Sequence, residues 1–137
     1  MVPLLKVFFS AAGRDAAAAG RLRDALNRVG VAAATDADIA AGSDRGEHLR
    51  TAMDTLDAVV ALITPAALSS AYVMSEVGAA IAAGKTVVPV VMTGRGLPAG
   101  LPAPLRRWQF VRAGKRDAAD VANEIKQRLM QLPASTA

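Results

Sequence analysis

The chain has 137 residues, of which 53% are hydrophobic and 20% charged, and its formal net charge is +4. This length and composition predict one domain with an ordinary apolar core and argue against a disordered chain. The absence of cysteine excludes disulfides, cysteine-ligated metal centres and thiol nucleophiles, and the single histidine, His48, excludes sites that need two imidazoles.

The first part of the chain predicts two strands separated by a helix. Residues 4–9 form a short apolar run rich in β-forming residues, which indicates a strand. Apolar residues recur at helical spacing over residues 15–29, and Gly30 follows where a left-handed C-cap belongs. Residues 31–35 predict a weak strand, and the Asp, Ser and Gly content of residues 36–46 predicts an exposed loop.

The middle of the chain continues this alternation. Asp44 and Glu47 have the spacing of a capping box, which predicts the start of a second helix. Residues 58–63 form a continuous apolar run, typical of a central strand covered on both faces, and Pro65 is expected to end it. Ser70 is a candidate N-cap of the helix that follows.

The remaining elements are two strands and a helix. Residues 87–92 predict a buried strand that lies near an edge or a bulge because it contains a proline, and residues 93–105 predict an irregular connection. Residues 108–111 predict a short last strand. Asp117 can cap a final helix, and residues 133–137 are expected to form a frayed tail or the start of a linker.

This order predicts an α/β fold of the flavodoxin-like type, with three layers, a five-stranded mostly parallel sheet and helices on both faces, over residues 1–132. In such sheets ligands bind beyond the carboxyl ends of the strands, where the winding direction reverses. We therefore expect three segments to meet there: residues 10–14, 36–46 and 64–76.

Two segments carry a family resemblance. Residues 70–76 read Ser-Ala-Tyr-Val-Met-Ser-Glu, and residues 84–90 read Gly-Lys-Thr-Val-Val-Pro-Val. They resemble the Ser-x-Trp-Val-x-x-Glu and Gly-Lys-x-apolar-Pro-apolar motifs of Toll/interleukin-receptor (TIR) domains. Residues 7–10, 38–42 and 59–65 resemble the opening strand, the loop after the second strand and the third strand of that family. The resemblance implies the flavodoxin-like fold and one of two classes, NAD⁺-cleaving enzymes or non-enzymatic adaptors.

Glu76 is the central candidate residue. It is the one acidic residue between Asp57 and Asp117, and it lies in the first turns of a predicted helix, where a carboxylate also interacts favourably with the helix dipole. The resemblance implies that Glu76 is the catalytic carboxylate of an NAD⁺ nucleosidase, a glycohydrolase or an ADP-ribosyl cyclase, with NAD⁺ as substrate and no cofactor or metal. A carboxylate suits this reaction because it can stabilise a developing oxocarbenium ion.

The resemblance also implies a set of residues that bind the substrate. Tyr72 stands where the family has tryptophan, one helical turn before Glu76, and its ring can stack on the dinucleotide or pack as an interfacial core residue. Ala11 and Ala12 stand where many active members carry an aromatic or polar residue, which favours the alternative of an adaptor or effector that acts through TIR–TIR contacts. The candidate substrate-binding residues are Ser10, Ala11, Gly13, Arg14, Asp38, Gly42 and Tyr72.

The expected partners follow from the same resemblance: homo-oligomers or filaments formed through TIR–TIR contacts, partly by residues 36–46, and a sensor domain or protein as trigger. The basic residues between 95 and 116 are expected to form a solvated face and not a nucleic-acid surface, because aromatic residues interleave with them only at Trp108 and Phe110. No transmembrane or signal segment is evident, so we expect a soluble, cytoplasmic protein. The high alanine and arginine content fits a GC-rich bacterial genome and an antiphage role.

A receiver-like signalling domain of the same fold class is a weaker alternative. Such a domain needs an acidic cluster at the end of its first strand and a phosphoacceptor aspartate after its third strand. This chain has Ser10, Ala11 and Ala12 at the first place and Thr64 and Pro65 at the second, so the residues disfavour that interpretation.

Overall fold

The computed structural model describes residues 5–38, 53–93, 98, 100–106 and 110–131. Short 3-10 helices (η) accompany the strands and α-helices. In chain order the elements are β1 (Lys6–Ser10), η1 (Gly13–Asp15), α1 (Ala16–Arg28), β2 (Ala32–Ala34), η2 (Asp36–Asp38), β3 (Ala58–Ile63), α3 (Pro65–Leu68), α4 (Ala71–Ala82), β4 (Thr86–Val91), α5 (Ala103–Arg106), β5 (Val111–Arg112) and α6 (Ala118–Met130).

The five strands form one parallel sheet in the order β2-β1-β3-β4-β5. In the register of this sheet, Phe9 of β1 lies opposite Val60 of β3, and Val7 lies opposite Ala33 of β2. The chain therefore passes from β1 to β2 on one side and then returns across β1 to β3 on the other. This confirms the predicted flavodoxin-like order and places the reversal of winding at the carboxyl end of β1.

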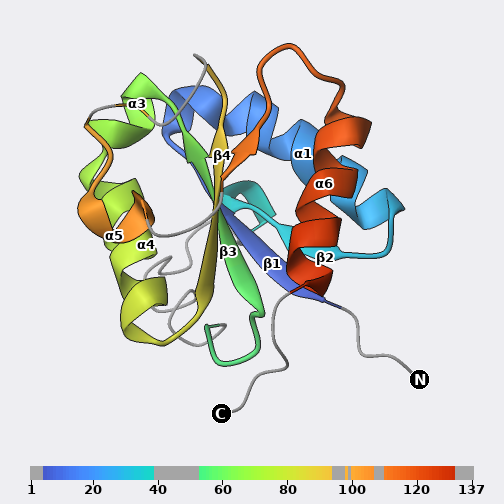
Figure 1. Cartoon of the computed structure of the whole chain (residues 1–137), viewed down its shortest axis with the longest axis horizontal. Helices are drawn as coiled ribbons and strands as arrows, with labels where there is room; N and C mark the ends of the chain where they lie inside the picture. Colours follow the sequence, from blue (N-terminus) through green and yellow to red (C-terminus); the bar gives the residue numbers. More distant parts are fainter. Residues whose placement is uncertain (1–4, 39–52, 94–97, 99, 107–109, 132–137) are drawn as a thin grey trace.

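Helices cover both faces of the sheet. In Figure 1 the sheet lies in the middle, with α1 and α6 on one face and α3, α4 and α5 on the other. The sheet separates two apolar clusters, one under α1 and α6 and one under α4. All six residues of β3 are buried, because this strand lies at the centre and contacts helices on both sides. Its continuous apolar run predicted that position correctly.

The helix ends predicted at Gly30 and Ser70 are confirmed, whereas the capping bond expected from Asp117 is not formed. Gly30 follows α1 with φ of +88°, and Gly84 follows α4 with φ of +74°, a region that glycine enters without steric cost. The Ser70 hydroxyl accepts a hydrogen bond from the Val73 N–H at 3.1 Å and so caps the first turn of α4. Asp117 lies at the N-cap position of α6, without a side-chain capping bond.

Two short helices depart from the predicted pattern. Pro65 was expected only to end the preceding strand, but it also begins α3, because proline suits the first turn of a helix and the Thr64 hydroxyl caps that turn. The connection expected to be irregular over residues 93–105 contains the start of α5. The last strand, expected at residues 108–111, is described as Val111–Arg112.

The proline in β4 has a clear structural setting. Pro89 lies opposite Ala61 of β3, and within the described residues β5 pairs with β4 only at Val90 and Val91. On that side β4 therefore has no described strand partner at Pro89, and a residue without an N–H is tolerated there. This agrees with the expectation of a strand near the sheet edge.

Several expectations fall on residues outside the described ranges. They include the loop around Gly42, the start of the helix expected at Asp44, the residue Trp108 and the tail at residues 133–137. Met53, which follows the second gap, is helical and buried. None of the described helices is long and apolar enough to cross a membrane.

Candidate functional site

Glu76 and Ser10 meet where the winding of the sheet reverses. Ser10 is the last residue of β1, Glu76 lies in the second turn of α4, and the Ser10 hydroxyl donates a hydrogen bond of 2.6 Å to Glu76 Oε1. Ser10 is fully buried and Glu76 is only 4% exposed. A buried carboxylate is tolerated only when polar groups stabilise its charge, and the Ser10 hydroxyl is one such group.

Tyr72 lies one turn before Glu76 on the same side of α4, and it remains 39% exposed. Its hydroxyl donates a hydrogen bond of 3.1 Å to Asp36 Oδ1. Burial, the nearby carboxylates of Glu76 and Asp36 and the hydrogen bond to Asp36 raise the pKa of Tyr72 above its ordinary value. The phenol is therefore protonated at neutral pH and acts as a hydrogen-bond donor.

A cavity of about 340 Å³ opens beside Tyr72. Small apolar side chains from the end of β1 and the start of α1 form part of its wall, and polar groups come from β2–η2 and the start of α4. All three segments predicted to meet at the site therefore contribute to this region. The lining residues are Phe9, Ala11, Ala12, Gly13, Ala16, Ala19, Thr35, Asp36, Ser70 and Tyr72.

The Ser10–Glu76 pair lies beside this cavity and is not part of its described lining. Ser10 immediately precedes the lining residue Ala11, and Glu76 lies next to Tyr72. The carboxylate is thus adjacent to a space that a ligand can enter, while Glu76 itself is almost fully buried. A negative charge in such surroundings acts more strongly on a nearby cation than it would in bulk solvent.

A second hydroxyl–carboxylate pair supports the same loops, and the sequence analysis missed it. The Thr64 hydroxyl donates a hydrogen bond of 2.6 Å to Asp15 Oδ2 and accepts one of 3.0 Å from the Ala67 N–H. The pair ties the connection after β3 to the segment before α1. Thr64 followed by Pro65 is a helix-start signal that could have revealed α3, but the partner Asp15 has no signature in the sequence.

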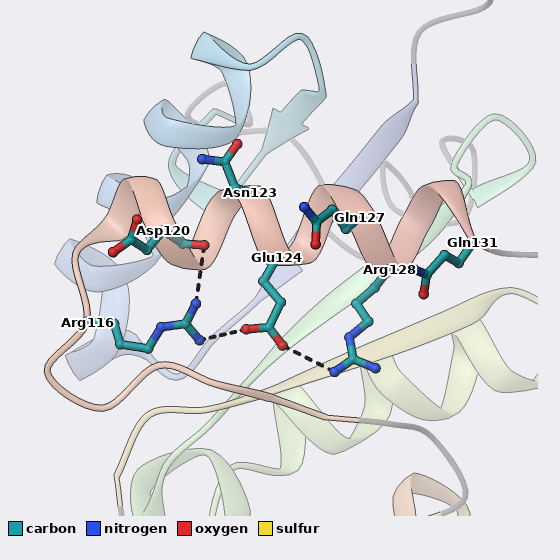
Figure 2. Close-up of a pocket in the computed structure, with 7 residues that line it drawn as sticks. All are labelled: Arg116, Asp120, Asn123, Glu124, Gln127, Arg128 and Gln131. Carbon is teal, nitrogen blue, oxygen red and sulfur yellow. Dashed lines mark hydrogen bonds and ion pairs between the residues drawn. The ribbon is translucent and has the colours of Figure 1, made fainter.

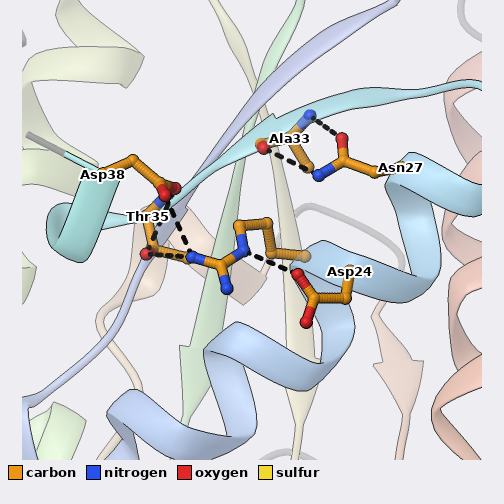
Figure 3. A network of polar contacts seen from close by, with 6 residues as sticks. Asp24, Asn27, Ala33, Thr35 and Asp38 are labelled. Atoms are coloured by element: carbon orange, nitrogen blue, oxygen red, sulfur yellow. Dashed lines mark hydrogen bonds and ion pairs between the residues drawn. The ribbon is translucent and has the colours of Figure 1, made fainter.

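Asp38 lies in a polar network that fixes η2 against α1 (Figure 3). Arg23 Nη1 donates to Asp38 Oδ1 at 3.0 Å, and the Thr35 N–H donates to Asp38 Oδ2 at 2.7 Å. Arg23 Nε also donates to Asp24 Oδ1 at 3.0 Å. Through these bonds Asp38 has a structural role, which is to hold η2 against α1. Its contact with substrate stays a prediction.

The other predicted substrate-binding residues occupy different places. Ala11, Gly13 and Tyr72 line the cavity, and Arg14 is exposed in η1 at the same end of the sheet. Ser10 is buried behind the cavity wall and contacts Glu76. Gly42 lies outside the described residues.

A larger hollow of about 560 Å³ follows the surface of α6, on the sheet face opposite α4 (Figure 2). Glu124 accepts hydrogen bonds there from Arg116 at 2.7 Å and from Arg128 at 3.2 Å. Burial raises the pKa of Glu124, but the hydrogen bonds and charges of Arg116 and Arg128 outweigh it and lower that pKa overall. These charged groups satisfy one another and are remote from Glu76.

Within the described residues, no three His, Cys, Asp or Glu side chains gather in a way that could hold a metal ion. The polar side chains in the described lining of the cavity are the hydroxyls of Thr35 and Ser70, the carboxylate of Asp36 and the phenol of Tyr72. Such a set can bind sugar hydroxyls and can stabilise positive charge.

The family model described as "TIR domain" matches residues 7–130. The chain belongs to the TIR domain family. That match spans every described element from the middle of β1 to the end of α6. No curated protein matches the chain.

Solved structures with the same fold include TIR domains of two other proteins. The TIR domain of the Toll-related receptor TRR-2 from Hydra magnipapillata aligns with a TM-score of 0.74 at 13% identity, over 91% of this chain and 98% of that one. The TIR domains of the activated Roq1 resistosome, which directly recognizes the pathogen effector XopQ, align with a TM-score of 0.59 at 19% identity, over 93% and 74% of the two chains.

A third similar structure is HP1043, an orphan response regulator of H. pylori. It aligns with this TIR domain at a TM-score of 0.52 and 16% identity, over 93% of this chain and 99% of that chain. At such identities these likenesses establish the fold alone. The acidic residues that the receiver alternative requires are absent from residues 10–12 and 64–65.

Proposed function

We propose that this TIR domain cleaves NAD⁺ between nicotinamide and ribose, with Glu76 as the catalytic carboxylate. The observation that carries the proposal is the environment of Glu76: a carboxylate that is 4% exposed, held by the Ser10 hydroxyl, beside a cavity at the carboxyl end of β1. A protein seldom buries an acidic side chain without a structural or chemical use for its charge.

The reaction requires little beyond that charge. Nicotinamide in NAD⁺ is a cationic pyridinium, so it leaves as a neutral ring and needs no general acid. The bond from ribose C1 to the pyridinium nitrogen breaks, the nitrogen keeps the electron pair, and positive charge develops on the ribose. Glu76 would stabilise that oxocarbenium ion until water or the adenine of the same molecule attacks C1. The attacking group forms the new bond to C1 and gives up one proton to solvent, which yields ADP-ribose or a cyclic isomer.

The cavity offers complementary contacts for part of the dinucleotide. The apolar wall formed by Phe9, Ala11 and Ala12 suits a flat ring, and the Tyr72 ring can stack on it. Asp36 and Ser70 can bind sugar hydroxyls at the same wall. Arg14 follows the lining residue Gly13 and is exposed, so its guanidinium can bind a phosphate of the dinucleotide that extends out of the cavity.

We further propose that the active form is a self-assembled oligomer in the cytoplasm, clustered by a sensor domain or protein, in a bacterial immune response such as antiphage defence. The support for assembly is the presence of TIR domains in the activated Roq1 resistosome. The composition of the chain, rich in alanine and arginine, supports the bacterial setting.

The test is chromatographic detection of nicotinamide and ADP-ribose-type products after concentrated protein is incubated with NAD⁺. Glu76→Gln removes the charge at nearly constant shape, and we expect it to lower the rate by about 100-fold or more. Glu124→Gln on α6 is the matched control, because it makes the same chemical change far from the cavity, and it should retain the wild-type rate.

An assay with crowding agents or forced oligomerisation completes the test. Release of nicotinamide that depends on Glu76 supports the enzyme. Equal rates in wild type and Glu76→Gln contradict the assignment of Glu76. No release under any of these conditions favours the adaptor alternative, for which the alanines at residues 11 and 12 are the specific observation.

A further inference from the structure

The Ser10 hydroxyl has one proton, and the structure shows where that proton is used. Oγ donates to Glu76 Oε1 at 2.6 Å, within the usual range of O–H···O hydrogen bonds. A hydroxyl that donates to Glu76 cannot donate the same proton to a ligand. Ser10 is also fully buried, whereas the cavity lining begins with its neighbours Phe9 and Ala11.

We infer that Ser10 is a positioning residue, which acts on the substrate only through Glu76 by fixing the orientation of its carboxylate. The inference rests on the proposed function and replaces direct substrate binding by Ser10. The two residues are 66 positions apart in the chain and belong to different layers, β1 in the sheet and α4 above it. Their bond therefore ties the carboxylate on the helix to an interior strand of the sheet.

The frame around Ser10 makes such a role physically effective. β1 lies between β2 and β3, and Ser10 lies opposite Ala61 in the register with β3. A glutamate side chain has three rotatable bonds, so a donor on a fixed strand removes freedom that the helix alone cannot remove. An electrostatic catalyst loses rate when its charge is misplaced by about 1 Å.

The kinetic test compares Ser10→Ala with Thr64→Val. Both variants delete a hydroxyl that donates a hydrogen bond of 2.6 Å to a carboxylate, and the two hydroxyls lie at the ends of neighbouring strands. Thr64 donates to Asp15 and not to Glu76, and it does not line the cavity. We expect Ser10→Ala to lower kcat for nicotinamide release by about 10- to 100-fold and to change the KM for NAD⁺ by less than about threefold. Thr64→Val should keep both values near those of wild type.

A conservative variant separates positioning from a general loss of structure. Ser10→Cys retains a weak donor of similar size, so it should have a kcat between those of wild type and Ser10→Ala. A rise in KM alone, or losses equal to those of Thr64→Val, would overturn the inference.

An unfolding cycle makes the test independent of activity. The free energies of unfolding of wild type, Ser10→Ala, Glu76→Ala and the double variant should be non-additive if the two side chains are coupled. Additive effects would overturn the contact itself. If the wild-type chain releases no nicotinamide, the proposed function and the catalytic role of Ser10 both fail, and a non-additive cycle then shows that the failure lies in the function and not in the contact.

Discussion

The Tyr72 hydroxyl donates a hydrogen bond to Asp36, which ties the first turn of α4 to η2 across the wall of the cavity. The same tyrosine lies next to Glu76, whose charge contributes to the raised pKa of Tyr72. Its ring and its hydroxyl therefore have separable tasks: the ring forms cavity wall, and the hydroxyl holds two segments together.

We predict that Tyr72→Phe and Tyr72→Ala differ in their effect on NAD⁺ cleavage. Phenylalanine keeps the ring, so KM should stay within about threefold of wild type. Alanine removes the stacking surface and should raise KM by about 10-fold or more, in line with the 1–3 kcal/mol typical of base–aromatic stacking. Steady-state kinetics measure both, and equal KM values for the two variants would contradict a stacking role.

We predict that Thr64→Val lowers the free energy of unfolding by about 2 kcal/mol. The substitution removes both a hydrogen bond to the Asp15 carboxylate and the cap of α3. Denaturant unfolding measures the loss. Ser69→Ala, which removes an exposed hydroxyl nearby, should change stability by less than about 0.5 kcal/mol. If Thr64→Val lowers the free energy of unfolding by no more than Ser69→Ala does, the Thr64–Asp15 pair contributes little to stability.

We predict a large difference between two apolar residues of α6. Ile125 is fully buried in the cluster under α1 and α6, and its truncation to alanine should cost about 3 kcal/mol through lost burial and a residual cavity. Met130, on the same helix, is 66% exposed, and Met130→Ala should cost less than about 0.5 kcal/mol. Thermal and denaturant unfolding of the two variants test this, and similar costs would contradict the described orientation of α6.

We predict that Glu124 stabilises the fold at neutral pH and not at low pH. Its pKa in the folded chain is lowered below the ordinary value of 4.5, so its contribution is present above that value and is lost as the pH falls through the folded pKa. Because the ion pairs of Glu124 with Arg116 and Arg128 lie at the surface, their contribution to the unfolding free energy should be below about 1 kcal/mol. The difference in unfolding free energy between wild type and Glu124→Gln should shrink from pH 7 to pH 3, and growth toward acid would contradict it.

Most of the fold could be predicted because its strands and longer helices have strong local signals. β3 is a continuous apolar run, α1 and α6 have helical spacing of apolar residues, and glycines end α1 and α4. The short helix α3 is not evident from the sequence, because a proline after an apolar run is equally typical of the end of a strand. Four-residue helices lack a full period of apolar residues, so capping residues such as Thr64 are their main signal.

The site could be predicted less completely, since its contacts join residues far apart in the chain. The meeting of the three segments followed from the sheet order, and Glu76 followed from the family resemblance. The partners could not be predicted: nothing local indicates that Ser10 bonds to Glu76 or that Asp15 bonds to Thr64. Asp38 matched a family segment, yet it lies in a network with Arg23 and Thr35 that only the folded chain reveals.

The outer strands of the sheet bear on how copies of this domain can associate. β2 has three residues, all alanine, and β5 as described has two, so each edge exposes only a short length of backbone hydrogen-bonding groups. Short edge strands are poor templates for adding a strand from another chain. The self-assembly that we propose should therefore depend on complementary side chains of helices and loops, which specify a partner, and not on backbone pairing, which accepts almost any extended chain.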